Sequence, residues 1–181
     1  TAAAFGAAWQ VWNYVQMPAF AIGMAVSSMA AQNVGAGSWD RVARVAKVGV
    51  VANFVMTGLL VVVIEIFSRQ ALGLFLPAGS PALAIAVHLN LIVAWSFIFF
   101  GVSFVLFGVV RATGAVMPPL IILFVCMILF RYPFALVLMD AWQANAIWWS
   151  FVLSAILAAG MALAYYKNGG WRKARMVPAG R

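Results

Sequence analysis

Charged side chains are scarce in this chain of 181 residues. Only 8% of the residues are charged and only three are acidic, whereas an average soluble domain carries about 25% charged residues. Apolar residues make up 67% of the sequence. A water-facing surface cannot be built from such a composition, which excludes a soluble globular domain and predicts an integral membrane protein.

Cysteine and histidine are also rare, with one residue of each. Because Cys126 lies alone in an apolar run, no disulfide can form within the chain, and we expect no metal site. The net charge of +8 comes from 11 lysines and arginines in short tracts between apolar runs, which is the pattern of a membrane protein. We therefore expect no nucleic-acid partner. Paired carboxylates and Ser/His pairs are absent from the apolar runs, so we expect neither an enzyme nor a cofactor.

Five apolar runs are each long enough to cross a membrane as a helix. About 20 residues span the hydrocarbon core, and in lipid the helix satisfies the backbone hydrogen bonds within one segment. The sequence predicts an all-α integral membrane bundle of five transmembrane helices, near residues 4–31, 46–67, 83–109, 118–139 and 146–166. Pro18 and Pro133 fall inside spans, where they predict kinks or locally opened backbone.

Basic residues gather on one side of the predicted bundle, while the connections at 76–82 and 140–145 contain no lysine or arginine. The positive-inside rule places the basic side, including a tail at 167–181, on the cytoplasmic side of a bacterial inner membrane. Arg69 alone lies near the other side, where we expect it to pair with Glu65, one helical turn away. Tryptophan and tyrosine are predicted at both interfaces, with Trp148 outside and Trp171 inside. The first residue would then lie outside, which predicts a further upstream span and a larger protein.

Four stretches, in order along the chain, resemble the multidrug and toxic compound extrusion (MATE) transporters. They are residues 6–19 (GAAWQVWNYVQMPA) with 30–37 (AAQNVGAG), 108–114 (GVVRATG) with Pro118 and Pro119, 130–133 (FRYP), and the basic tail from 165 to 175. In that family they look like parts of the eighth helix, the tenth helix with its following loop, the eleventh helix and the cytoplasmic tail. The resemblance implies helices eight to twelve of twelve, which form most of one six-helix lobe.

The resemblance also implies a secondary antiporter that expels amphipathic, often cationic compounds in exchange for Na⁺ or H⁺. Its partners would be the lipid bilayer, small organic cations, and the N-terminal lobe and seventh helix that this sequence lacks. One branch of the family places acidic cation ligands in this lobe, but the third span here contains no acidic residue. We therefore expect the coupling-ion site outside this chain. Two alternatives stay open: a lipid-linked saccharide flippase of a related class, and a membrane assembly subunit without transport of its own.

Polar and aromatic residues of the first span are the candidates for a substrate cavity. Four of them share one helix face, and Gln10 and Met17 form a neighbouring stripe. Amides and aromatic rings suit a cavity for flat, cationic compounds, although amides also join transmembrane helices by hydrogen bonds. The cavity candidates are Trp9, Gln10, Asn13, Gln16, Met17 and Phe20.

Two ionisable residues inside the spans complete the candidate set. His88, near the external end of the third span, could take part in H⁺ coupling, or a neighbouring carbonyl or water could simply satisfy its ring. Arg131 lies in the middle of the fourth span, where an unpaired charge costs at least about 2.5–3.5 kcal/mol. It should face a cavity, carbonyls freed by Pro133, or a carboxylate from elsewhere in the protein; a purely structural role is the alternative.

Overall fold

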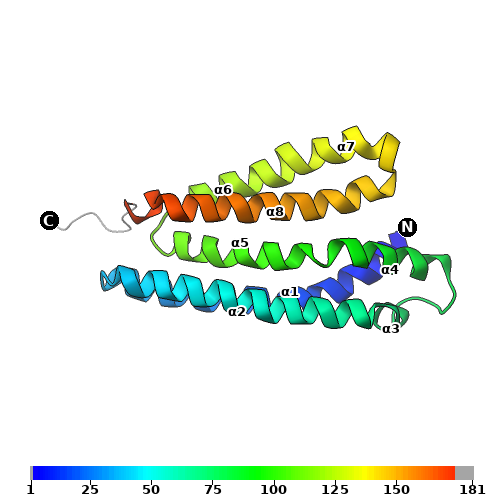
Figure 1. Ribbon diagram of the computed structural model, residues 1–181, viewed down its shortest axis with the longest axis horizontal. Coiled ribbons are helices and arrows are strands. Elements are labelled where there is room, and N and C mark those ends of the chain that lie inside the picture. The colour runs from blue at the N-terminus through cyan, green and yellow to red at the C-terminus, as the bar shows by residue number, and fades with distance from the viewer. Residues whose placement is uncertain (1, 174–181) are drawn as a thin grey trace.

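The computed structural model describes residues 2–173, and this part of the chain is an all-α bundle without strands (Figure 1). Four helices are long and apolar enough to cross a membrane, and the bent pair α4–α5 counts as a fifth crossing if it is one span. The helices are α1 (Ala2–Gly35), α2 (Trp39–Ile66), α3 (Ser68–Gly73), α4 (Pro81–Val93), α5 (Ser96–Arg111), α6 (Met117–Phe124), the π-helix η1 (Val125–Phe130), α7 (Arg131–Trp142), α8 (Ala144–Asn168) and the 3₁₀-helix η2 (Gly170–Lys173). The predicted fold class is confirmed.

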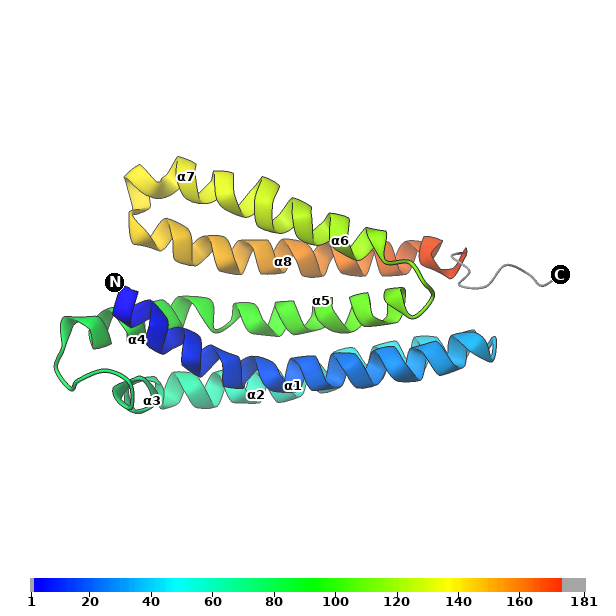
Figure 2. The same cartoon turned by 180° about the vertical axis from the view of Figure 1, so that it is seen from behind.

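Helix α5 lies in the middle of the bundle and contacts α1 and α2 on one side and α8 on the other (Figures 1 and 2). The continuous span formed by α6, η1 and α7 packs against α8 at the outer edge. The α1–α2 and α5–α6 connections share one end of the bundle with the end of α8, whereas α3 and the start of α4 lie at the other end (Figure 1).

The third predicted span, residues 83–109, is divided into two helices. Helix α4 ends at Val93, α5 begins at Ser96, and the pair is bent by 45° at the break. Backbone N–H groups of Phe97 and Ile98 donate to carbonyls only three residues back, Ala94 and Trp95. These tight bonds wind the chain more closely than an α-helix does, which turns the helix axis without help from proline or glycine.

The two prolines inside spans behave as their chemistry requires. Pro133 has no N–H to donate to Leu129, and the π-helix η1 ends three residues before it, at Phe130, with the Arg131 N–H bonded to the Cys126 carbonyl five residues back. The wider π turn opens the backbone at the place where the proline interrupts the α-helical ladder. Helix α1 continues through Pro18 and is bent (Figure 2). The local opening predicted at Pro133 is therefore confirmed.

The helices approach one another closely where small residues allow it. The Ser27 hydroxyl of α1 donates to the Gly108 carbonyl of α5 at 3.1 Å. A Cβ atom on Gly108 would lie 3.0 Å from the backbone oxygen of Gly23. The backbones of α1 and α5 are thus nearly in contact, which is the usual way in which transmembrane helices gain packing energy.

Trp171, predicted at the cytoplasmic interface, is only 1% exposed. Its Nε1–H donates to the Tyr166 carbonyl at 2.8 Å, its ring stacks on Tyr166 at 5.2 Å, and Trp39 packs edge-on at 6.1 Å. The Thr113 hydroxyl donates to the Trp171 carbonyl at 3.0 Å. This one residue therefore joins the end of α8 to the α1–α2 and α5–α6 connections. The rest of the predicted basic tail, residues 174–181, lies outside the described residues.

The Trp171→Phe substitution is expected to lower the free energy of unfolding by about 1 kcal/mol, because phenylalanine keeps the stacking but loses the hydrogen bond to Tyr166. Chemical unfolding of the complete protein in mixed micelles measures this loss. Trp95→Phe is the matched control, because Trp95 is 44% exposed; equal losses in the two variants would contradict the role assigned to Trp171.

Candidate functional site

The stripe predicted on α1 runs along one edge of this helix and meets α5 at its Phe20 end. Toward one end, Trp9 stacks on Phe5 with ring centroids 6.1 Å apart. Toward the other, Phe20 packs edge-on against Phe104 at 5.1 Å and Phe100 at 5.9 Å, both on α5. Both aromatic members of the stripe therefore meet further rings, while Trp9 remains 47% exposed and Phe20 38% exposed.

The amides of the same stripe lie between these aromatic contacts. Asn13 and Gln16 are half-buried, and Gln16 donates one amide hydrogen to the Trp12 carbonyl of its own helix at 3.4 Å. The second amide hydrogen and the oxygen of Gln16 remain suited to a ligand. Gln10 and Met17 are exposed on the neighbouring stripe and stand outside the ring contacts. The structure thus groups four of the six candidates along one edge.

Rings on α8 extend this edge toward α7. Phe5 stacks on Trp148 at 6.1 Å, and Trp12 lies 6.4 Å from Phe151. The guanidinium carbon of Arg131 sits 3.3 Å above the centroid of Phe151. We call two groups of contacting rings the aromatic band. One group comprises Phe5, Trp9, Trp12, Phe97, Trp148 and Phe151, and the other comprises Phe20, Phe100 and Phe104. Trp148, predicted at the external interface, is a buried member of this band.

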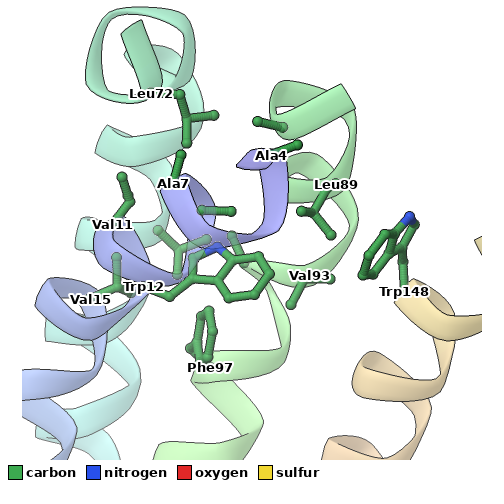
Figure 3. Packing of buried hydrophobic residues seen from close by; sticks show 14 of the residues in the cluster. Ala4, Ala7, Val11, Trp12, Val15, Leu72, Leu89, Val93, Phe97 and Trp148 are labelled. Carbon is green, nitrogen blue, oxygen red and sulfur yellow. The ribbon is translucent and has the colours of Figure 1, made fainter. Parts of the chain in front are cut away.

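The sequence did not reveal a hydrogen-bond chain that begins at Trp12 of the band. Trp12 Nε1 donates to Asn90 Oδ1 at 2.8 Å, and Asn90 Nδ2 donates to Glu65 Oε1 at 3.4 Å. Both Trp12 and Asn90 are fully buried, and Trp12 lies in the middle of the apolar cluster (Figure 3). Glu65 was expected to pair with Arg69; its partner is Asn90, because a buried amide must satisfy its own hydrogen-bonding groups. The sequence signal that could have revealed this chain is an asparagine, Asn90, inside an apolar span.

His88 lies at the end of the bundle opposite Trp171. Its Nε2 is 3.1 Å from Asn145 Oδ1 at the start of α8, so a neighbouring amide oxygen satisfies the ring. His88 also lines a cavity of about 440 Å³ together with Trp142 and Trp148. Through Trp148 this cavity adjoins the aromatic band, but His88 itself does not meet the stripe on α1.

Arg131 lines a second cavity, of about 320 Å³, between α7 and α8. Its Nη1 lies 3.1 Å from the sulfur of Met127, one turn earlier, and its charge rests on the Phe151 ring. Among the environments expected for this residue, the structure places it at a cavity. Ring contacts lead from Arg131 through Phe151, Trp12 and Phe5 to Trp9, one end of the α1 stripe.

A bundle of long apolar helices with polar side chains held inside it defines a multi-pass membrane protein, whose surroundings are the lipid bilayer. The family model described as MatE matches residues 1–137, roughly three quarters of the chain. The chain therefore belongs to the MatE family, and the resemblance to MATE transporters is confirmed.

Curated relatives agree with this assignment. The probable multidrug resistance protein YoeA of Bacillus subtilis is 42% identical over 120 residues, which cover 66% of this chain and 26% of that protein. The probable multidrug resistance protein YpnP of the same organism is 33% identical over 173 residues, or 95% of this chain and 38% of that protein. The chain thus spans about a quarter to two fifths of the length of these relatives. No solved structure is significantly similar to it.

Proposed function

We propose that this chain is part of a membrane exporter that moves amphipathic, often cationic compounds out of the cell in exchange for Na⁺ or H⁺. The observation that carries the proposal is the edge of α1 where the Asn13 and Gln16 amides lie between the rings of Trp9 and Phe20. The family membership and the printed names of the multidrug resistance relatives support it. The chain then corresponds to helices eight to twelve, most of one six-helix lobe.

The chemistry of this edge suits compounds of that kind. Aromatic faces attract organic cations electrostatically and also stack on flat rings. Amides offer donors and acceptors without a fixed charge, so they can orient ligands of different shapes. In the proposal the lobe moves as a unit against the N-terminal lobe, and the edge of α1 faces one side of the membrane and then the other.

The coupling ion is proposed to bind outside this chain, in the N-terminal lobe or the seventh helix, and no cofactor takes part. The stripe on α1 carries no carboxylate, and neither do α4 and α5, whereas Na⁺ and H⁺ sites in membranes are usually built on acidic residues. The proposed location is the bacterial inner membrane with a cytoplasmic C-terminus, because the basic residues lie at that end of the bundle.

Reconstitution of the complete protein in vesicles tests the proposal. A fluorescent organic cation is expected to move against its gradient when a Na⁺ or H⁺ gradient is imposed. The double variant Asn13→Leu/Gln16→Leu should raise the half-saturating dye concentration about tenfold, because two hydrogen bonds of about 0.5–1.5 kcal/mol are lost.

Gln70→Leu is the matched control, since Gln70 is an exposed amide on α3, and it should transport as the wild type does. Absence of gradient-driven dye movement in the wild type would refute the export function. Binding of a lipid pyrophosphate in preference to organic cations would favour the flippase instead.

A further inference from the structure

The cavity between α7 and α8 contains a guanidinium group whose partners within the described part of the chain are a sulfur atom and an aromatic ring. Arginine has five N–H donors, and thioether sulfur is a weak acceptor. Most of the hydrogen-bonding capacity of Arg131 is therefore left for a stronger acceptor. The residues that line this cavity include Met127, Arg131, Tyr132, Ala135, Ser150 and Phe151.

Carboxylates of the chain itself do not fill this role. The chain has three acidic residues. Asp40 lies in the first turn of α2 and Glu65 accepts from Asn90, whereas Asp140 is nine residues further along α7, about 13.5 Å from Arg131 along the axis. A positive charge at mid-span without an anionic partner is costly, so an anion from outside these elements is expected at this place.

We propose that this cavity, the Arg131 pocket, binds the carboxylate end of an amphipathic aromatic ligand. The planar guanidinium matches a carboxylate with two parallel hydrogen bonds, and the ring of Phe151 with the apolar walls holds the hydrophobic body. The volume of about 320 Å³ lies within the range of small-molecule sites. The walls beside Arg131 are mostly apolar, which favours an occupant that carries a hydrophobic body together with its carboxylate.

Ring contacts connect the pocket to Trp9, at one end of the proposed export site. Phe151, below Arg131, contacts Trp12 of the aromatic band. The proposal rests on the export function and deepens it by assigning a separate subsite, between α7 and α8, to the carboxylate end of a substrate. Because Arg131 repels cations, the pocket and the edge of α1 select opposite charges.

Binding of three pyrene probes to the complete protein in lipid nanodiscs tests the pocket. Pyrenebutyrate, pyrenebutanol and 1-pyrenemethylammonium share one aromatic body and differ in the charge of the attached group. Pyrenebutyrate should bind the wild type more tightly than pyrenebutanol does, while the ammonium probe reports on the edge of α1. The Arg131→Met variant should bind pyrenebutyrate at least about tenfold more weakly, because charge-assisted hydrogen bonds are lost, while pyrenebutanol binding should change less than about threefold.

Two further variants sharpen the result. Arg44→Met removes an exposed arginine from α2 and should leave all three affinities unchanged. Ala135→Phe keeps the charge but fills the cavity, so it should weaken pyrenebutyrate binding even if Arg131→Met does not fold.

Equal losses of pyrenebutyrate and pyrenebutanol in Arg131→Met would overturn the proposal, as would a wild type that does not prefer the carboxylate. A loss of all binding together with a lower unfolding midpoint would assign Arg131 to a partner within the protein and overturn it too. The vesicle assay with the organic cation judges export separately: if it fails while pyrenebutyrate binding still depends on Arg131, only the proposed function is wrong.

Discussion

Replacing Trp12 with alanine is expected to destabilise the protein by about 3–5 kcal/mol, the range for deleting a large buried aromatic side chain. Trp12 is fully buried and meets Phe5, Phe97 and Phe151 at centroid distances of 5.9, 5.6 and 6.4 Å. The deletion removes all three ring contacts and leaves the oxygen of Asn90 without its donor. Dispersion contacts are what transmembrane helices lose when they separate, so the effect should persist in lipid.

Chemical unfolding in mixed micelles measures this effect, with Tyr14→Ala as the control. Tyr14 is an aromatic residue of the same helix that is 64% exposed, so its removal should cost less than about 1 kcal/mol. If the two alanine variants unfolded at the same midpoint, Trp12 would not be the centre of the packing.

The hydrogen bond within this cluster can be separated from the packing. Trp12→Phe keeps a ring and removes the N–H donor, and Asn90→Leu removes the acceptor. Combined in a double-mutant cycle, the two variants should show a coupling energy of about 0.6–1.7 kcal/mol, the range for polar pairs between membrane helices.

The number and type of helices could be predicted because their causes are local. Long apolar runs can only be helices in lipid, and a proline inside such a run removes a known donor, so the opening before Pro133 was visible in the sequence. The break between α4 and α5 could not be predicted from the sequence. The residues at the break, Ala94 and Trp95, are neither proline nor glycine, and their conformation is set by packing against other helices.

The candidate site could be predicted on one helix and not beyond it. The spacing of Asn13 and Gln16 places them on one face of α1 whatever surrounds them. Which rings meet that face depends on how α5 and α8 are rotated about their own axes. The helical repeat of α1 does not determine this rotation. The partner of Asn90 could not be predicted for the same reason, since its donor Trp12 is 78 residues away in the chain.

The contact between α2 and α5 should be the next most sensitive place in the bundle. Gly101→Ala is expected to destabilise the protein by about 1–3 kcal/mol through overpacking. The added Cβ would overlap the side-chain amide of Asn53, which is fully buried and accepts a hydrogen bond from Thr57 at 3.2 Å. Since Asn53 cannot turn into solvent or lipid, the two helices must separate, and unfolding in mixed micelles measures the cost.

Alanine at Gly160 should instead raise the stability of the protein. Gly160 lies inside α8, and a Cβ added there would have nothing within 4 Å, so alanine gains helix propensity of up to about 1 kcal/mol without a clash. Adding Asn53→Ala to Gly101→Ala should recover part of the lost stability, because the overlapping amide is gone. If Gly101→Ala were as stable as Gly160→Ala, α2 and α5 would have room to spare at this point, and helix propensity rather than close packing would determine the response to alanine.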